Sequence, residues 1–96
     1  MEEISRFDIV EAGGTLYVVV ESDILPPDNA VVVIPLLRGY PGLPRLNPTI
    51  AFKGDTYVLA TRLIVAVVRP ALTVVGSAEA QADDITRALD MLLYGF

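Results

Sequence analysis

The adjacent carboxylates of Asp83 and Asp84 are residue types that could hold a metal ion or serve as a general base. They stand at the start of a helical pattern, where acidic residues are favoured because the amino end of a helix carries partial positive charge. We therefore interpret this pair as a structural feature of the helix start. The other acidic pair, Glu2 and Glu3, is interpreted as a solvated terminus.

Composition excludes most other catalytic chemistry. The chain of 96 residues contains no cysteine and no histidine, so it has no disulfide, thiolate metal site, cysteine nucleophile or histidine base. Gly13-Gly14 lacks the strand-to-helix context of a phosphate-binding loop, and no P-loop, dinucleotide or zinc motif occurs. We expect a protein that is not an enzyme and that has neither a cofactor nor a metal site.

Residues 83–96 have the pattern of a helix that packs one face on a core and presents an aromatic residue on the other. Steps of about 100° per residue place Tyr94 opposite the apolar face. Arg87, Asp90 and Met91 share the side of Tyr94, and the apolar face consists of Ile85, Ala88, Leu89, Leu92 and Phe96. Tyr94, followed by Gly95, is therefore a candidate contact with another molecule.

The charge balance argues against direct binding of nucleic acid. The formal net charge is −5 and the isoelectric point is about 4.4, whereas affinity for nucleic acid depends on basic side chains that neutralise phosphates. The seven Lys and Arg residues are scattered along the chain. The longest apolar run, residues 63–68, is far shorter than the roughly 20 residues that span a bilayer, and nothing resembles a secretory signal. We expect a soluble protein of the cytoplasm with no membrane contact.

The elements that position these residues are mostly strands. Thirteen valines favour β structure, and turn residues separate predicted strands at residues 4–10, 15–21, 30–37, 49–52, 56–61, 63–68 and 71–75. Pro35 indicates a bulge or an edge position, residues 38–48 form the longest loop, and Ser77 or Asp83 caps the helix. These elements predict one domain, residues 1–96, built as a small β-barrel or sandwich with a helix packed on it.

Three segments, at residues 18–20, 31–34 and 63–68, are apolar on both faces of a strand. A strand with one buried face alternates apolar and polar residues, and so small a domain has little interior with which to cover both faces. We therefore expect the second face to meet another subunit. The alternative is a central sheet that is covered on both sides within one chain.

Several segments, in order along the chain, together resemble the CcdB family of toxins. The matching segments are ESDIL (21–25), VIPL (33–36), GD (54–55), ALTVVG (71–76) and DITRALDMLLYGF (84–96). They extend from the second predicted strand to the last residue and end in an aromatic-Gly-apolar triplet. Members of this family are plasmid- or chromosome-borne toxins of toxin–antitoxin pairs, and they poison DNA gyrase.

The resemblance implies an SH3-like small β-barrel with an added small sheet and a C-terminal helix, assembled as a homodimer. It also implies that the dimer binds the A subunit of gyrase and traps the enzyme on cleaved DNA, and that a small CcdA-like antitoxin neutralises it. The implied gyrase contacts are Tyr94, Gly95 and Phe96, in place of the family's Trp-Gly-Ile, together with Asp90, Leu93, Ser22, Ile24 and Leu25.

The chain departs from the family at informative positions, since better-known relatives have tryptophan at Tyr94, isoleucine at Phe96 and an amide at Asp90. The loop before the helix is shorter, and residues 59–69 align poorly. Two alternatives therefore stay open. One is a CcdB-like binding protein without toxicity. The other is an endoribonuclease toxin of the MazF and Kid type, which shares the barrel but needs a basic RNA groove that this acidic chain does not evidently offer.

Overall fold

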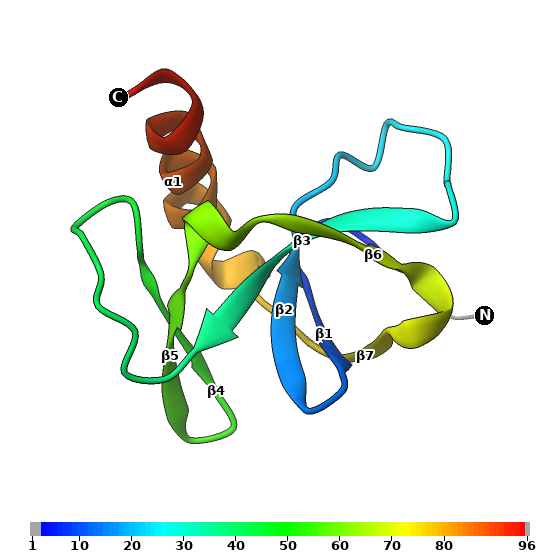
Figure 1. Ribbon diagram of the computed structural model, residues 1–96, viewed down its shortest axis with the longest axis horizontal. Coiled ribbons are helices and arrows are strands. Elements are labelled where there is room, and N and C mark those ends of the chain that lie inside the picture. The colour runs from blue at the N-terminus through cyan, green and yellow to red at the C-terminus, as the bar shows by residue number, and fades with distance from the viewer. Residues whose placement is uncertain (1–2, 96) are drawn as a thin grey trace.

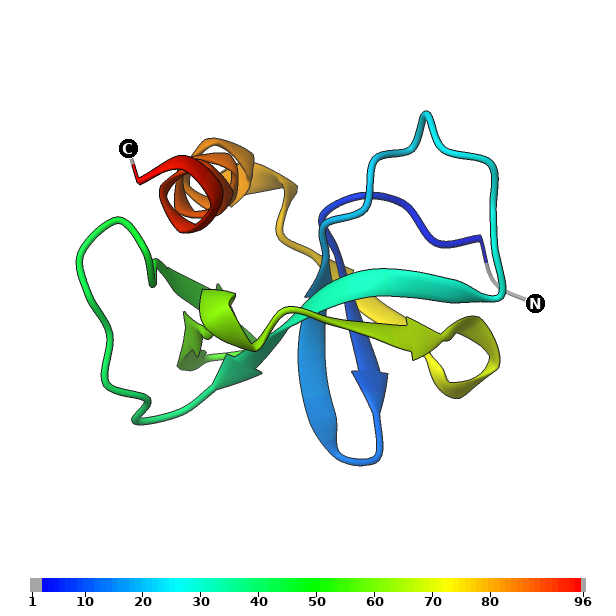
Figure 2. The same ribbon diagram turned by 45° about the horizontal axis from the view of Figure 1, so that its top comes forward.

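The computed structural model describes residues 3–95 and contains a sheet of antiparallel strands followed by one α-helix. The elements are β1 (Asp8–Ala12), β2 (Thr15–Val19), β3 (Ala30–Leu37), β4 (Thr49–Phe52), β5 (Asp55–Leu59), η1 (Thr61–Leu63), β6 (Val65–Val68), η2 (Arg69–Ala71), β7 (Thr73–Ser77), η3 (Glu79–Gln81) and α1 (Ala82–Tyr94), where η marks a 3₁₀ turn. The strand order is β4-β5-β3-β2-β1-β7, with β6 beside β3. The sheet is strongly twisted, and α1 lies along one side of it (Figures 1 and 2). This architecture confirms the predicted mainly β, small-barrel fold with a C-terminal helix.

Strand β3 is the centre of the sheet, because three strands hydrogen-bond to it. β2 lies along one side, while β6 and β5 share the other. Pro35 stands where β6 gives way to β5, and its carbonyl accepts a hydrogen bond from the N–H of Ala60 at 2.9 Å. The nitrogen and carbonyl of a strand residue face the same side, so the N–H that proline lacks is not needed by β2. The predicted edge or bulge at Pro35 is therefore wrong: the residue lies in a central strand, where its partner changes.

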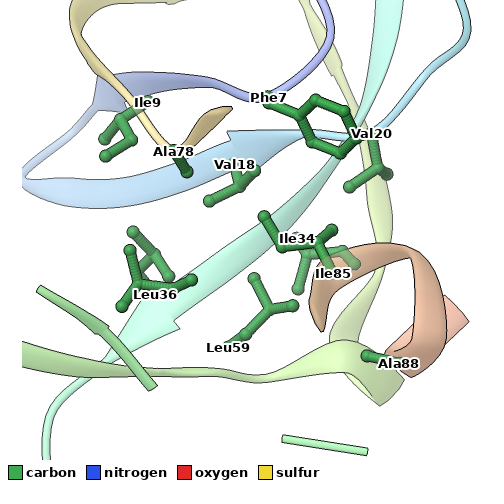
Figure 3. Close-up of a cluster of buried hydrophobic side chains, with 11 residues drawn as sticks. Phe7, Ile9, Val18, Val20, Ile34, Leu36, Leu59, Ala78, Ile85 and Ala88 are labelled. Carbon is green, nitrogen blue, oxygen red and sulfur yellow. The ribbon is translucent and has the colours of Figure 1, made fainter. Parts of the chain in front are cut away.

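Side chains along the central strands alternate between two hydrophobic clusters, one on each face of the sheet. In β2, Val18 belongs to the larger cluster and Val19 to the smaller one, and both are buried. In β3, Ile34 and Val33 divide in the same way. Figure 3 shows the larger cluster, to which α1 contributes Ile85. Because each buried aliphatic side chain contributes about 1.5–3 kcal/mol, this two-sided core is the main stabilising feature of the fold.

The expectation that the apolar runs meet another subunit is therefore wrong for residues 18–20 and 31–34. Their second face is covered within the chain, where Leu72 joins the smaller cluster. The run at residues 63–68 is different, because Leu63, Ile64, Val65 and Val68 are 47%, 37%, 44% and 49% exposed. Apolar surface on this segment remains uncovered in the single chain.

Strands β4 and β7, at the two ends of the strand order, meet through side chains. A Cβ atom on Gly76 in β7 would lie 2.5 Å from Cε1 of Phe52 in β4, so only glycine leaves room for the ring. The register between β1 and β7 skips Val75, which forms a β-bulge. A bulge increases the bend of a strand. The bulge and the aromatic contact together bring the two ends of the sheet into contact.

The first strand starts later than predicted, at Asp8 instead of residue 4. Phe7 has a φ of 72°, which lies outside the strand region and is unusual for a bulky residue. Its N–H donates to the carbonyl of Val19 and its carbonyl accepts from Ala78, both at 2.7 Å. Phe7 therefore bridges two parts of the chain, which holds its backbone in this conformation.

The predicted loop at residues 38–48 is confirmed, and it is fixed to the barrel at one end. Leu46 is 4% exposed, and its carbonyl accepts a hydrogen bond from the hydroxyl of Thr61. Asn47 donates through Nδ2 to the carbonyl of Leu59 at 2.9 Å. Thr61 begins η1, so residues 61 and 63, which were predicted to end one strand and begin the next, lie in a 3₁₀ turn, and β6 begins only at Val65.

Gly76→Ala should destabilise the protein by about 1–3 kcal/mol, because an added methyl group would overpack the contact with Phe52. Urea unfolding followed by circular dichroism measures this loss. The combined variant Gly76→Ala/Phe52→Leu should lose less than the sum of the two single variants, since the shorter side chain relieves the clash. Strictly additive losses would contradict the contact between ring and glycine.

Candidate functional site

The end of α1 carries the predicted aromatic contact. Tyr94 and Leu93 are each 66% exposed, and Asp90, one turn earlier, is also exposed. Gly95 follows with a φ of 82°, and its N–H donates to the carbonyl of Met91 at 3.0 Å. This left-handed conformation is readily adopted by glycine, so the chain can leave the helix directly after Tyr94. Phe96, the third residue of the predicted contact triplet, lies outside the described residues.

The opposite face of α1 is anchored in the core. Ile85 and Ala88 are both 0% exposed and belong to the larger cluster (Figure 3). Leu89 packs against the same cluster. The predicted division of the helix is therefore confirmed for Ile85, Ala88 and Leu89 on the core face and for Tyr94 on the exposed face, whereas Phe96 lies outside the described residues. A ring on a helix held in this way is presented by a rigid element, which favours precise recognition.

The surroundings of the acidic pair at the helix start fit a structural role. Asp83 and Asp84 lie in the first turn of α1, where their charge complements the helix dipole. Asp84 also forms an exposed ion pair with Arg87, with 3.4 Å between Oδ1 and Nη1. The predicted caps are not used for α1: Asp83 lies inside the helix, and Ser77 instead accepts the N–H of Glu79 in η3 at 3.1 Å.

The loop after β2 carries the second set of predicted contact residues. Ile24 is 92% exposed and Leu25 is 55% exposed. Ser22 folds the loop: its Oγ accepts the N–H of Ile24 at 3.2 Å, and its carbonyl accepts the N–H of Leu25 at 3.3 Å. Two large aliphatic side chains are thus held outward on a short hydrogen-bonded turn.

Sequence reasoning missed two interactions that support this loop. Asp23 Oδ1 accepts the backbone N–H of Arg6 at 2.8 Å, which ties the loop to the N-terminal segment. Glu21 and Arg69 form an ion pair at 3.7 Å, with side chains only 16% and 14% exposed. The role of Asp23 could have been suspected from the sequence, because it is an acidic residue in a short polar turn and such side chains often bind backbone N–H groups. No local pattern could indicate the pair of Glu21 and Arg69, because the partners are distant in sequence.

The two predicted contact regions lie apart on a single chain. In both Figure 1 and Figure 2, the loop after β2 and the end of α1 stand on either side of the central strands. A small ligand therefore cannot touch both regions of one chain. Only a large partner surface, or a second copy of the chain, could bring them into one interface.

Arg38 lies outside both regions, and its surroundings shift the pKa of its guanidinium. A hydrogen bond with Tyr57, and then the charge of Asp55, raise the pKa of the Arg38 guanidinium above its usual range. Arginine is already charged at physiological pH. The shift therefore changes no protonation state and gives Arg38 no acid–base role.

A small β-barrel with exposed aromatic and aliphatic side chains at two places has the features of a protein that acts by binding another macromolecule. The family model described as CcdB protein matches residues 8–95, which include both regions. The chain therefore belongs to the CcdB family, which consists of toxins of the gyrase-poisoning type that are not themselves enzymes. This membership argues against the endoribonuclease alternative. A search of curated proteins finds no match.

The helices within residues 3–95 are too short or too polar to cross a membrane.

Tyr94→Ala should change the free energy of unfolding by less than about 1 kcal/mol, because exposed positions contribute little to stability. Ile85→Ala should cost about 2–5 kcal/mol, because it leaves a cavity in the core. Chemical denaturation of the two variants measures the difference. Equal destabilisation by both would contradict the assignment of these residues to opposite faces of α1.

Proposed function

We propose that the protein is the toxin of a type II toxin–antitoxin pair, which binds the A subunit of DNA gyrase and traps the enzyme on cleaved DNA. The observation that carries this proposal is the exposed ring of Tyr94 at the end of α1, in a chain that belongs to the CcdB family. Tyr94 takes the position of the tryptophan that contacts gyrase in better-known relatives. The protein acts by occupying a surface of gyrase and needs no catalytic group of its own.

The end of α1 suits a cationic target. A guanidinium stacked on an aromatic face gains about 0.5–2 kcal/mol, although tyrosine offers a smaller face than tryptophan. Asp90 precedes Tyr94 by one helical turn and therefore lies on the same side of α1. Its carboxylate adds negative charge beside the ring. We infer that Tyr94 and Asp90 together bind one arginine of the A subunit, with Leu93, Gly95 and Phe96 extending the contact.

The homodimer required by this mechanism has a candidate interface on residues 63–68. Val65 and Val68 lie in β6, which pairs only with β3 among residues 3–95, so its outer edge is unpaired. An unpaired edge strand with uncovered apolar side chains favours association with another chain. Because η1, at the start of this segment, lies against α1, joining two copies here would bring their α1 helices toward each other.

Two further surfaces of the chain, the loop after β2 and the turn after β1, take part in the proposed function. Ser22, Ile24 and Leu25 form a second contact with gyrase, and a small CcdA-like antitoxin with a disordered tail neutralises the dimer. The family's antitoxin surface includes the region after the first strand, which in this chain is the short turn at Gly13 and Gly14. This difference favours an antitoxin specific to this toxin. Gyrase and antitoxin are both cytoplasmic, so the proposed site of action is the bacterial cytoplasm.

A gyrase cleavage assay with purified protein tests the proposal. The wild type should increase the amount of cleaved DNA held by gyrase, and Tyr94→Ala should reduce this effect about tenfold, as expected for the loss of about 1.4 kcal/mol of stacking. Tyr94→Trp should retain or strengthen it. Tyr40→Ala, which changes a tyrosine in the loop at residues 38–48, serves as the matched control. A folded wild type that leaves gyrase unaffected would favour the non-toxic alternative.

A charged residue in the proposed dimer interface should separate the subunits. Val65→Asp would place a carboxylate on the apolar face, and burying it between two copies without a partner is unfavourable. Analytical ultracentrifugation should show a dimer for the wild type and a monomer for the variant. Leu43→Asp is the control, because Leu43 is 55% exposed in another part of the chain. An unchanged dimer in Val65→Asp would place the interface elsewhere.

A further inference from the structure

A cavity of about 480 Å³ lies at the base of the loop after β2. Its walls come from the N-terminal segment, the end of β2 with its following loop, β3 and η2. Apolar side chains and charged side chains both line it. The lining residues used below are Val19, Leu25, Val31, Glu3, Glu21, Asp23 and Arg69.

Arg69 lines the cavity, and the positive charge of its side chain is already neutralised by a carboxylate of the same chain. Its guanidinium pairs with Glu21 at 3.7 Å, and both side chains are largely buried. Nε of Arg69 also donates to the carbonyl of Asp28, and Oε1 of Glu21 accepts the N–H of Val32 at 3.3 Å. These contacts hold the pair as a fixed, neutral part of the wall.

The other two carboxylates of the cavity belong to Glu3 and Asp23, which are both exposed. Oδ1 of Asp23 accepts a hydrogen bond from the backbone N–H of Arg6. The guanidinium of Arg6 instead stacks on the ring of Phe7, with 4.8 Å between Cζ and the ring centroid. Within residues 3–95, neither Asp23 nor Glu3 forms an ion pair. The cavity therefore combines apolar walls with uncompensated negative charge.

We propose that this cavity binds an arginine side chain of the protein partner, at a place separate from Tyr94. The apolar walls suit the methylene stem of arginine, and the carboxylates of Glu3 and Asp23 suit its guanidinium head. The same carboxylates would repel a phosphate backbone, which argues against nucleic acid. Leu25 lines the cavity and Ile24 precedes it on the same loop, so a partner that contacts them would also cover the cavity. The identity of this partner as the gyrase A subunit rests on the proposed function, whereas the preference for a cation rests on the cavity.

Titration of the wild-type protein with N-acetylarginine amide, followed by NMR of the backbone amides, tests the cavity directly. Saturable shifts should appear at Ser5, Val19 and Val31, and the neutral analogue N-acetylcitrulline amide should bind about tenfold more weakly. The double variant Glu3→Gln/Asp23→Asn should weaken binding of the arginine probe to a similar degree. Asparagine at position 23 retains an acceptor for the N–H of Arg6, so the loop should stay in place. Glu11→Gln, near the end of β1 and outside the cavity lining, is the matched control.

Absence of saturable shifts, or equal binding of the neutral analogue, would overturn the inference. Affinity for the purified gyrase A subunit then separates this inference from the proposed function. The inference expects Glu3→Gln/Asp23→Asn to weaken binding to the subunit about tenfold. If that variant binds as tightly as the wild type while Tyr94→Ala does not, the inference fails and the proposed function stands. If the wild type does not bind the subunit, the proposed function fails, and the probe titration still decides whether the cavity binds a guanidinium.

Discussion

Strand β3 hydrogen-bonds to β2 along one side and to β6 and β5 along the other, so the whole sheet is attached to it. Its side chains also face two different hydrophobic clusters, with Val33 in the smaller one and Ile34 in the larger one. A shift of one residue would exchange the two faces and disrupt both clusters at once. This constraint fixes the register of the barrel. Pro35 is compatible with it because the missing N–H falls on the side where the partner strand changes.

The positions of both candidate contact regions follow from this register. The larger cluster takes in Ile85 and Ala88, which sets the rotation of α1 and turns Tyr94 outward. At the end of β2, Val20 is still buried, and Glu21 begins the loop with its largely buried ion pair to Arg69. The candidate binding residues thus lie where rigid elements end, and the core determines their direction.

Features that depend on local pattern could be predicted from the sequence. The two faces of α1 follow from helical periodicity, and turn residues marked the bounds of β3 and the loop at residues 38–48. The covering of the second face of β2 could not be predicted, because it depends on Leu72, which is distant in sequence. The same holds for the contact of Phe52 with Gly76. The positive φ of Phe7 was also unpredictable, since bulky residues avoid that conformation. Residues of the loop after β2 became candidates only through the family resemblance.

The distribution of charge divides the surface into areas that suit different kinds of partner. With a net charge of −5 per chain, two copies repel each other at long range, so a dimer needs a contact area without like charges. Residues 63–68 provide one, because the segment is entirely apolar and partly uncovered. The other two areas pair apolar surface with carboxylates: Tyr94 with Asp90 on α1, and the cavity with Glu3 and Asp23. A cationic partner is attracted to these areas by their negative charge. Under the proposed function, the uncharged face therefore suits a second copy of the chain, and the acidic areas suit a basic surface of the target.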